Sequence, residues 1–423
     1  MTRSEHIGPE LVQSALRSAQ TVGTPFWLYD AEAIRGRVKQ LAGFDTVRFA
    51  QKANSNTHIL RLLREAGAMV DAVSLGEIER ALLAGYVPGT AAHEIVFTAD
   101  VIDHATLKRV VALNIPVNCG SLDMITQVGQ ASPGHDVWLR INPGFGHGHS
   151  RKTNTGGPLS KHGIWHEELV EALKLVDQHG LHLVGLHMHI GSGVDYGHLR
   201  QVCTSMVDLV RQGNHSLDAI SAGGGLSTPY RATDTEIDTA EYFAIWDAAR
   251  REIETIVGNP VKLEIEPGRY LVANAGLLVA EVRAVKRVAD KHFVLLDAGF
   301  SDLARPAMYG SYHEIGFMTP EGQPVTGPLQ PAAIGGPLCE SGDVFTQLDG
   351  GDVEFRSIAL PKVGDLAIFR DAGAYGASMS SNYNSRPLAA EVMLDNGDLS
   401  IIRNRQRIED LLDLEIRGQL GRI

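Results

Sequence analysis

Apolar and polar positions follow a regular rhythm between residues 46 and 270. Short apolar runs, often β-branched, are typical of buried strands, and the stretches between them repeat their apolar positions with helical spacing. The predicted strands are Val47–Lys52, Met69–Ser74, Ile95–Ala99, Ile115–Gly120, Val137–Asn142, Leu183–Ile190, Ala219–Ala222 and Val261–Glu266. The predicted helices are Ile59–Glu65, Glu77–Ala84, Ala105–Ala112, Glu167–Gln178, Leu199–Arg211 and Thr239–Ile256. This alternation predicts a (β/α)8 TIM barrel, and a doubly wound open sheet is the alternative that the pattern leaves open.

The segments on either side of this region have different patterns. Glu10–Gln20 predicts an amphipathic helix, Pro25–Tyr29 predicts a strand, and Asp30 can cap a helix over Ala31–Leu41. Beyond Arg269, strand-like runs follow one another without helices and end in an acidic helix around Ile408–Arg417. These runs are Leu277–Val288, His292–Asp297, Val353–Leu360, Leu366–Phe369, Glu391–Leu394 and Leu399–Arg403. We expect a barrel over residues 31–270 and an all-β domain, sandwich or barrel-like, over residues 271–423 together with 1–30.

The composition narrows the class of protein. A chain of 423 residues is long enough for two domains, and it contains no run of apolar residues that could span a membrane. The N-terminal stretch lacks the apolar core of a secretory signal, and three cysteines form no paired framework, so we expect a cytoplasmic protein. The formal net charge of −12 argues against nonspecific binding to nucleic acid or to an anionic membrane.

The predicted strand ends carry the candidate chemistry, because the carboxyl ends of barrel strands converge on one face. Lys52 ends the first strand, and a buried or semi-buried amine at such a position can attack a carbonyl group. Asp71 lies at the end of the second strand and Arg140 on the fifth. Ser74 and Glu77 form an S-x-x-E capping box, which explains them without a catalytic role.

The later strand ends add an imidazole pair, a glycine turn and a carboxylate. His187 and His189 alternate with apolar residues, so both point to the same side of the strand. Ser192 and the glycines 223–225 can offer hydroxyl and backbone N–H groups to a phosphate. Glu266 lies on an apolar strand and needs a partner, either an arginine such as Arg140 or a protonated ring nitrogen. A lysine, a phosphate cradle, a stacking imidazole and a carboxylate match the requirements of pyridoxal phosphate.

The motifs that carry these residues resemble the fold-type III pyridoxal-phosphate-dependent amino-acid decarboxylases, and within them the branch that acts on meso-diaminopimelate. The resemblance covers nearly the whole chain. It rests on the ordered set FAQKANSN, DAVSLGE, HMHIGSG, GGG, EPGR, RPAMYGSYH, GPLCESGDVF and GAYGASMSSNYNSRP. It implies decarboxylation of meso-diaminopimelate to L-lysine and CO2, the last step of lysine synthesis. It also implies that pyridoxal phosphate is the cofactor and that no metal is needed.

The resemblance also implies a role for individual residues. Lys52 would hold the cofactor covalently, His189 would stack on its ring, and Glu266 would pair with its ring nitrogen. The implied cofactor contacts are Lys52, Asp71, Arg140, His189, Ser192, Gly224, Gly225, Glu266, Pro267, Gly268, Arg269 and Tyr375. The implied substrate contacts are Arg269, Arg305, Tyr309, Glu340 and Tyr375. The loop over residues 146–163 is similar to the family's lid, but His162 stands where many members have Phe.

Cys339 is implied to be the proton donor, reaching the site from the second subunit of a homodimer. Its neighbours Glu340 and Asp343 would tend to raise the pKa of the thiol and keep it protonated. Without the motif around it, a small buried apolar cysteine would be the simpler interpretation. Tyr383 falls in the family's YN element and receives no role.

Other functions stay open at this point. A related decarboxylase could act on ornithine, arginine or carboxynorspermidine, although Arg269 and Arg305 favour a substrate with a second carboxylate. An alanine racemase would share the two-domain plan, but the CESGD element argues against it. HMH could indicate a metal-dependent amidohydrolase, yet there the motif belongs on the first strand. A non-catalytic homologue would be expected to lose Lys52 or Cys339.

Overall fold

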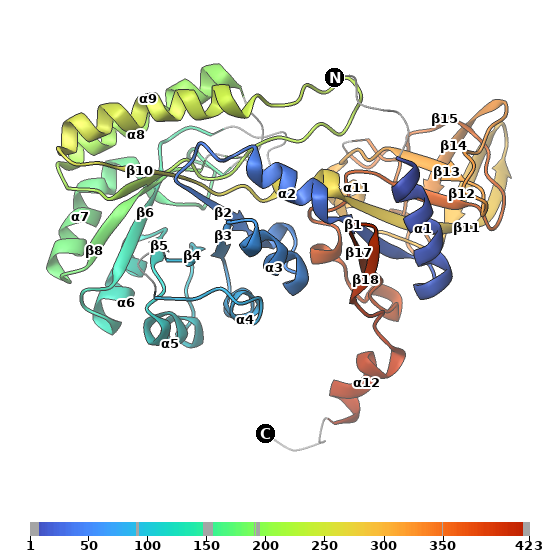
Figure 1. Ribbon diagram of the computed structural model, residues 1–423, viewed down its shortest axis with the longest axis horizontal. Helices are drawn as coiled ribbons and strands as arrows, with labels where there is room; N and C mark the ends of the chain where they lie inside the picture. Colours follow the sequence, from blue (N-terminus) through green and yellow to red (C-terminus); the bar gives the residue numbers. More distant parts are fainter. Residues whose placement is uncertain are drawn as a thin grey trace. The chain divides into compact units, whose positions relative to one another are not determined.

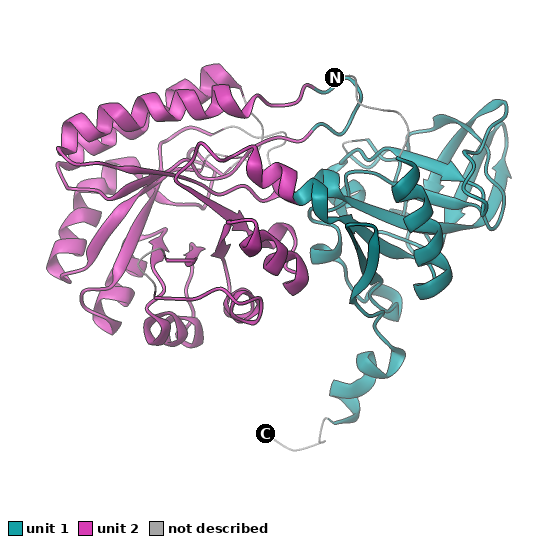
Figure 2. Cartoon of the chain, in the orientation of Figure 1, with its two compact units in different colours: residues 1–34, 229–234, 272–423 teal, residues 35–228, 235–271 magenta. Residues whose placement is uncertain are grey.

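The computed structural model describes residues 8–89, 93–146, 155–189, 191, 195–348 and 350–417. The chain forms two compact units (Figure 2). The barrel unit comprises residues 35–228 and 235–271, and the β unit comprises residues 1–34, 229–234 and 272–423. Residues 31–34 and 229–234, which lie inside the range that the sequence pattern assigned to the barrel, belong to the β unit.

Eight parallel strands close the barrel. They are β2 (Thr46–Ala50), β3 (Met69–Ala72), β4 (Ile95–Ala99), β5 (Val117–Cys119), β6 (Asp136–Asn142), β8 (His182–His187), β9 (Ala219–Ser221) and β10 (Lys262–Ile265). The strands pair in this order, and β10 pairs with β2 to complete the ring. A ninth strand, β7 (Ile164–Trp165), pairs with β6. The closed ring confirms the predicted TIM barrel and rules out the open sheet.

Helices surround the barrel strands (Figure 1). They are α3 (Thr57–Glu65), α4 (Leu75–Leu83), α5 (His104–Leu113), α6 (Leu122–Ala131), α7 (Leu169–Gln178), α8 (Tyr196–Gly213) and α9 (Thr239–Val257). The sequence pattern missed α6, whose interior holds a threonine, a glycine and β-branched residues of low helix propensity. The signal at its start was present, because the Ser121 side chain accepts a hydrogen bond from the Met124 N–H at 3.2 Å.

One layer inside the barrel shows how closely the strands approach. Val96, Trp138, Val184 and Ala219 form a buried apolar cluster. A Cβ atom at Gly185 would lie 2.0 Å from the Ala219 carbonyl oxygen, so only glycine fits on β8 at this point. The layers nearer the strand ends therefore rest on a tightly packed base.

The β unit is built on one mixed sheet. Its strands are β1 (Phe26–Asp30), β11 (Gly276–Val288), β12 (Lys291–Leu296), β13 (Ile315–Met318), β14 (Leu329–Gly335), β15 (Arg356–Ala359), β16 (Leu366–Phe369), β17 (Ala390–Asp395) and β18 (Asp398–Arg403). β1 pairs antiparallel with β11 and parallel with β17, so the N-terminal strand joins this unit as predicted. The sequence pattern missed β13 and β14.

One helix packs on this sheet, and another is the last element of the described chain. α1 (Pro9–Val22) packs Leu11, Val12 and Leu16 against a core that includes Phe26, Leu28 and Val279. The remaining helices are α2 (Ala31–Lys39), α10 (Arg269–Val272), α11 (Arg305–Tyr309) and α12 (Ile408–Ile416). Short 3-10 turns lie at η1 (Gln51–Ala53), η3 (His166–Glu168), η4 (Ala273–Ala275), η5 (Ala377–Met379) and η6 (Tyr383–Ser385). Within the described residues, no helix is both long and apolar enough to cross a membrane.

Candidate active site

Lys52 lies in the 3-10 turn η1, just beyond the end of β2 at Ala50. Its side chain is exposed at the mouth of the barrel, whereas the sequence analysis expected a buried or semi-buried amine. The strand ends two residues earlier than predicted, and the turn carries Lys52 out onto the rim. Burial raises the pKa values of Asp71 and Glu77, and the positive charge of Lys52 opposes this rise in both, which shows that these carboxyl groups lie within its field.

Ser74 and Glu77 act as a helix cap, as the sequence pattern predicted. The Ser74 hydroxyl accepts a hydrogen bond from the Glu77 N–H at 3.2 Å, and the Glu77 carboxylate accepts one from the Val73 N–H at 2.8 Å. These bonds satisfy backbone donors at the start of α4. Burial raises the pKa of Glu77, while the Val73 bond and the Lys52 charge oppose this effect.

Glu266 is buried just beyond the end of β10, and its partners come from the neighbouring strands. His187 Nε2 lies 2.8 Å from one carboxylate oxygen, and the Ser221 hydroxyl donates to the other at 3.0 Å. Burial alone would raise the pKa of Glu266, but the charge and hydrogen bond of His187 and the Ser221 bond lower it to about 2. Glu266 is therefore a carboxylate at neutral pH.

These partners differ from the arginines considered in the sequence analysis. Arg140 instead lies 4.0 Å from Asp100, and the other strand carboxylate, Glu264, forms a bidentate pair with Arg48. Sequence reasoning missed Ser221 and the role of His187 as a partner of Glu266. The pairing register, in which Ser221 lies opposite both Glu264 and His187, brings them to Glu266.

Asp71 faces the same interior as Glu266 and is only 4% exposed. Burial, and then the negative charge of Glu266, raise the pKa of Asp71 well above its ordinary range. A hydrogen bond with Thr98 and the charge of Lys52 act in the opposite direction. Among the described residues, neither Oδ1 of Asp71 nor the second ring nitrogen of His187 has a hydrogen-bond partner.

His189 lies beyond β8 and packs against the turn formed by the three glycines. Its ring carbon Cε1 would lie 3.6 Å from a Cβ atom at Gly224 and 3.7 Å from one at Gly225. Burial, and then the positive charges of Arg140 and Lys52, lower the pKa of His189 well below its ordinary value. The ring is therefore neutral at physiological pH and can lie against another aromatic ring without adding charge.

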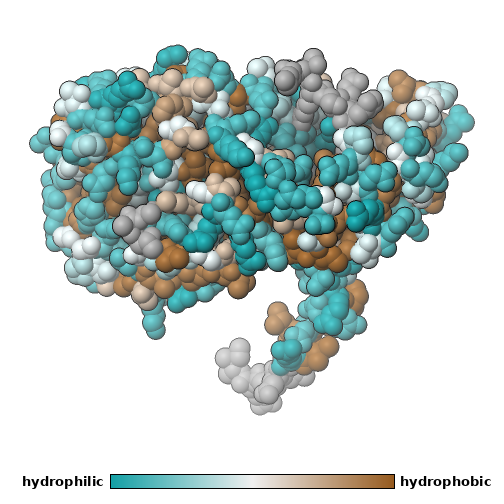
Figure 3. Space-filling view, in the orientation of Figure 1, coloured by the Kyte–Doolittle hydropathy of each residue, from teal (hydrophilic) through white to brown (hydrophobic). Residues whose placement is uncertain are grey.

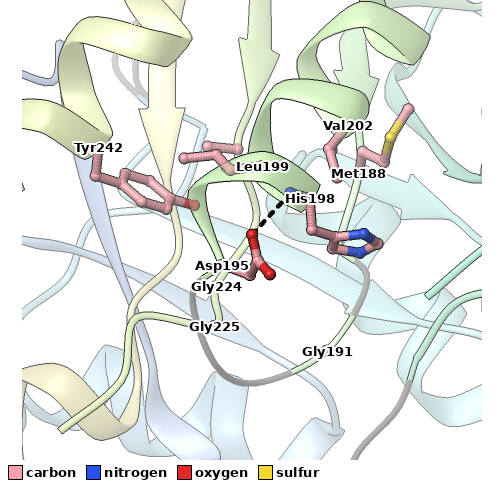
Figure 4. A pocket seen from close by; sticks show the side chains of 10 residues that line it. Met188, Gly191, Asp195, His198, Leu199, Val202, Gly224, Gly225 and Tyr242 are labelled. Carbon is pink, nitrogen blue, oxygen red and sulfur yellow. Dashed lines mark hydrogen bonds between the residues drawn. The ribbon is translucent and has the colours of Figure 1, made fainter. Parts of the chain in front are cut away.

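The glycine turn approaches other backbone too closely for any side chain. A Cβ atom at Gly225, where φ is +105°, would lie 2.4 Å from the Gly191 carbonyl oxygen, and one at Gly224 would lie 2.6 Å from that of Glu266. Figure 4 shows the small pocket beside this turn, with Asp195 and Tyr242 on its walls. Asp195 caps α8 by accepting hydrogen bonds from the Gly197 and His198 N–H groups.

Arg140 and the end of the predicted lid meet at Asp100. His162 Nδ1 forms a hydrogen bond with one Asp100 oxygen, and the Gly163 N–H donates to the other at 3.0 Å. Burial would raise the pKa of Asp100, but the His162 bond and the Arg140 charge lower it. His162 thus anchors this part of the loop through a polar contact.

The remaining predicted cofactor residues of the barrel unit lie in the loop before α8 and directly after β10. Ser192 and residues 147–154 of the lid lie outside the described residues. Pro267 and Gly268 follow β10, and the Pro267 carbonyl accepts a hydrogen bond from the Ala50 N–H at 3.3 Å. Arg269 begins the short helix α10 and is partly buried.

The predicted substrate residues belong to the β unit. Arg305 begins α11 and is 4% exposed, and Tyr309, which ends the same helix, is half-buried. Tyr375 is half-buried and has a φ of +58°, a left-handed conformation that is uncommon for a side chain of this size.

Cys339 is exposed, whereas Cys119 and Cys203 are buried. Its N–H donates a hydrogen bond to the Asn384 side-chain oxygen at 2.9 Å, a contact that sequence reasoning missed although the YN element contains this residue. Glu340 is exposed, and its carboxylate accepts a hydrogen bond from the Tyr383 hydroxyl at 3.4 Å. The Asp343 carboxylate is engaged by the backbone N–H groups of Phe300 and Leu338, at 2.7 and 2.8 Å.

The barrel residues fit a phosphorylated pyridine aldehyde. The amine is at the rim, a permanent carboxylate lies inside, a neutral imidazole lies at the strand end, and the glycine turn leaves backbone approachable. Buried polar atoms without hydrogen-bond partners, on Asp71 and His187, provide further groups for such a ligand.

Comparisons with known proteins agree with this chemistry. Residues 32–273 match the family model described as pyridoxal-dependent decarboxylase, pyridoxal binding domain. Diaminopimelate decarboxylase of Streptomyces coelicolor is 61% identical over 409 residues, which cover 97% of this chain and 92% of that protein. The enzyme of the same name from Escherichia coli is 60% identical over 405 residues, 96% of each chain.

The solved structures include a close match to the whole fold. A crystal structure of diaminopimelate decarboxylase superimposes with a TM-score of 0.94 at 59% sequence identity, covering 96% of this chain and 97% of the other. Both units are included at this coverage. The chain therefore belongs to the diaminopimelate decarboxylase family of pyridoxal-dependent decarboxylases.

Proposed function

We propose that this chain is a carboxy-lyase that converts meso-diaminopimelate to L-lysine and CO2, the last step of lysine synthesis, with pyridoxal phosphate as its cofactor. The observation that carries the proposal is the 60% identity to the Escherichia coli enzyme over 96% of both chains. The gathering of Asp71, His189, Gly225 and Glu266 near Lys52 supports it independently, because a decarboxylase of this type needs those groups at one barrel mouth.

Pyridoxal phosphate, when bound, accepts the electron pair that the departing carboxylate leaves on the α carbon. The protein has to hold this cofactor, keep its ring protonated and supply a proton afterwards. Lys52 would hold the cofactor aldehyde through its amine, and its exposed position on the rim leaves that amine accessible from solvent.

Glu266 holds a proton on the ring nitrogen. Its pKa of about 2 keeps it ionised, so it attracts a protonated pyridine, and each of its oxygens can accept a further hydrogen bond besides those from His187 and Ser221. His189, neutral and held against the glycine turn, would offer its ring face to the cofactor ring. Asp71 and Arg140 are the remaining polar residues assigned to the surroundings of the cofactor.

The phosphate group is assigned to the glycine turn after β9 and to the residues that follow β8 and β10. Gly224 and Gly225 carry no side chain that could shield their backbone N–H groups, and Ser192, Pro267, Gly268 and the N–H of Arg269 complete the set. These assignments follow the family motifs and are supported by the contacts of the glycine turn.

Substrate recognition is assigned to Arg269, Arg305, Tyr309, Glu340 and Tyr375. Arginine pairs bidentately with carboxylate, and Glu340 can pair with an ammonium group, which suits a substrate that carries both at its distal end. A substrate such as ornithine or arginine lacks the second carboxylate.

Cys339 donates the proton to the α carbon, from the second subunit of a homodimer. Its exposure supports this assignment, because a residue that serves a partner chain must lie at the surface. Helix α12 supports a dimer too, since it exposes Ile408, Leu412 and Ile416 at four-residue intervals, and apolar residues are visible on it in Figure 3. The three unpaired thiols suit a cytoplasmic location.

A direct assay tests the proposed function. Purified protein reconstituted with pyridoxal phosphate is expected to release CO2 from meso-diaminopimelate, with a kcat/KM at least about a hundredfold above those for ornithine and arginine. Lys52→Ala is expected to lose at least about a thousandfold in kcat. Preferred turnover of ornithine or arginine would favour the alternative decarboxylase, and a Lys52→Ala variant as active as the wild type would refute the proposal.

A further inference from the structure

Arg305 is held by two uncharged aromatic side chains inside the β unit. Its Nη1 lies 3.0 Å from His313 Nε2, and its guanidinium carbon lies 4.8 Å from the centre of the Tyr230 ring. Both Arg305 and His313 are almost fully buried, at 4% and 1% exposure. These two contacts restrain the plane of the guanidinium, and neither of the two partners is an acidic side chain.

The hydrogen bonds of His313 determine where its proton lies. Its Nδ1 is 2.9 Å from the backbone carbonyl oxygen of Arg370, which can only accept, so Nδ1 carries the hydrogen. Arginine has only donors, so Nε2 has to be the bare nitrogen that accepts from Arg305. His313 is therefore a neutral imidazole in the Nδ1–H form and serves as an acceptor for Arg305.

Tyr230 reaches this cluster from a loop that starts in the barrel. The loop runs from β9 to α9 and contains both the glycines 223–225 and residues 229–234, the six residues that belong to the β unit. The Tyr230 ring meets the His313 ring edge-on, with centres 5.4 Å apart and planes at 82°. One side chain thus contacts both Arg305 and the residue that orients it.

We propose that His313 and Tyr230 are positioning residues that orient Arg305 toward the distal carboxylate of the substrate. The inference rests on the proposed function, which assigns Arg305 to substrate binding. Bidentate pairing requires a guanidinium fixed in one plane, and an arginine side chain has several rotatable bonds to restrain. His313 restrains it from one end and the face of Tyr230 restrains it from the other.

Two variants of His313 separate the contribution of its hydrogen bond to Arg305 from that of its hydrogen bond to the Arg370 carbonyl. The amide of His313→Asn can still donate to the Arg370 carbonyl but does not extend to Arg305, whereas the longer amide of His313→Gln can accept from Arg305. We expect His313→Asn to raise KM for meso-diaminopimelate about tenfold, with kcat changed by less than about threefold, and His313→Gln to recover most of that loss. Equal KM values for His313→Asn and the wild type would overturn the proposal.

A pair of inhibitors gives a readout that a general structural defect would not reproduce. L-lysine keeps the distal carboxylate, and 1,5-diaminopentane is the same molecule without it. His313→Asn and Tyr230→Leu are each expected to raise the inhibition constant of L-lysine about tenfold and to leave that of 1,5-diaminopentane within about twofold. Equal weakening of both inhibitors would mean that the site as a whole is disturbed, and would overturn the proposal.

Tyr312→Leu is the matched control. The guanidinium carbons of Arg231 and Arg356 lie 3.9 and 4.2 Å from the centre of the Tyr312 ring, in the same unit of the protein. Tyr312→Leu is expected to leave the inhibition constants of L-lysine and 1,5-diaminopentane unchanged. If His313→Asn fails to fold, the comparison of Tyr230→Leu with Tyr230→Phe tests the proposal, because only the leucine variant lacks the aromatic face. Wild-type protein that releases no CO2 would refute the proposed function instead.

Discussion

At the scale of single residues, two buried carboxyl groups near Lys52 are driven in opposite directions. Burial dominates at Asp71 and raises its pKa, whereas His187 and Ser221 overcome burial at Glu266 and lower its pKa. The negative charge of Glu266 also raises the pKa of Asp71. Partners on neighbouring strands, rather than residue type, therefore decide which acid keeps its proton.

A third acid, Asp302, makes the stability of the folded protein depend on pH. Burial raises the pKa of Asp302 to about 6, although the Gly299 N–H donates to its carboxylate and Arg386 lies nearby. In the unfolded chain the ordinary value is 3.8. Between about pH 4 and pH 6 the folded state binds more protons, so its stability falls as the pH rises, by up to about 3 kcal/mol from this group.

The variant Asp302→Asn removes this titration and keeps an acceptor for the Gly299 N–H. We expect Tm of the variant minus Tm of the wild type to increase between about pH 4 and pH 7, in favour of the variant. Thermal unfolding at a series of pH values measures this difference, in which the other titrating groups cancel. A difference that is independent of pH would contradict the raised pKa of Asp302.

Asn384 has a left-handed backbone conformation and binds the backbone of Cys339. Its φ of 54° is left-handed, and its side chain accepts the Cys339 N–H at 2.9 Å. Asn384→Gly keeps this conformation and loses the acceptor, whereas Asn384→Asp keeps both. We expect the glycine variant to lower kcat about fivefold, as one hydrogen bond is worth about 1 kcal/mol, and the aspartate variant to stay close to the wild type. Equal kcat values for the two variants would show that the bond does not position Cys339.

At the scale of elements, the glycine turn after β9 is shaped by close backbone approach. Gly225→Ala would bring a Cβ atom to 2.4 Å from the Gly191 carbonyl at a φ of +105°. We expect this variant to bind pyridoxal phosphate at least about tenfold more weakly, measured by titrating apoprotein and following the absorbance of the bound cofactor. Gly36→Ala in α2 is the control, because its Cβ atom meets nothing within 4 Å. Equal affinities in both variants would contradict a phosphate site at this turn.

Most elements could be read from the periodicity of the sequence, and the misses have physical causes. β13 was missed because it has only four residues and contains Gly316, and β14, with seven residues, was missed because it contains Pro331 and ends in a glycine. α11 escaped because five residues are too few to show a helical period. The predicted Ile59–Glu65 helix, in contrast, lies within α3, because its buried leucines and isoleucine repeat with clear helical spacing.

At the scale of the whole molecule, the proposed dimer can be tested by complementation. If Cys339 serves the partner subunit, a chain with Lys52→Ala and a chain with Cys339→Ala together form one complete site in each mixed dimer. Equal co-expression is expected to restore about a quarter of wild-type activity, since half of the dimers are mixed and each has one intact site of two. Activity no higher than that of the separate variants would place both residues in one chain.

The sequence by itself determined the types and the order of the chemical groups at the strand ends, and with them the barrel and the family. Alternation, helical spacing and strand ends are local properties that a single chain displays in one dimension. The sequence was therefore sufficient to predict Lys52, His189 and Glu266 as site residues.

Only the tertiary structure decided how these groups are paired. Glu264 and Glu266 have the same pattern in the sequence, yet one binds Arg48 and the other binds His187 and Ser221. His313 and Tyr230 are 83 positions apart and meet at Arg305. Such pairings depend on strand register and on chain segments brought together from a distance, and neither leaves a periodic trace in the sequence.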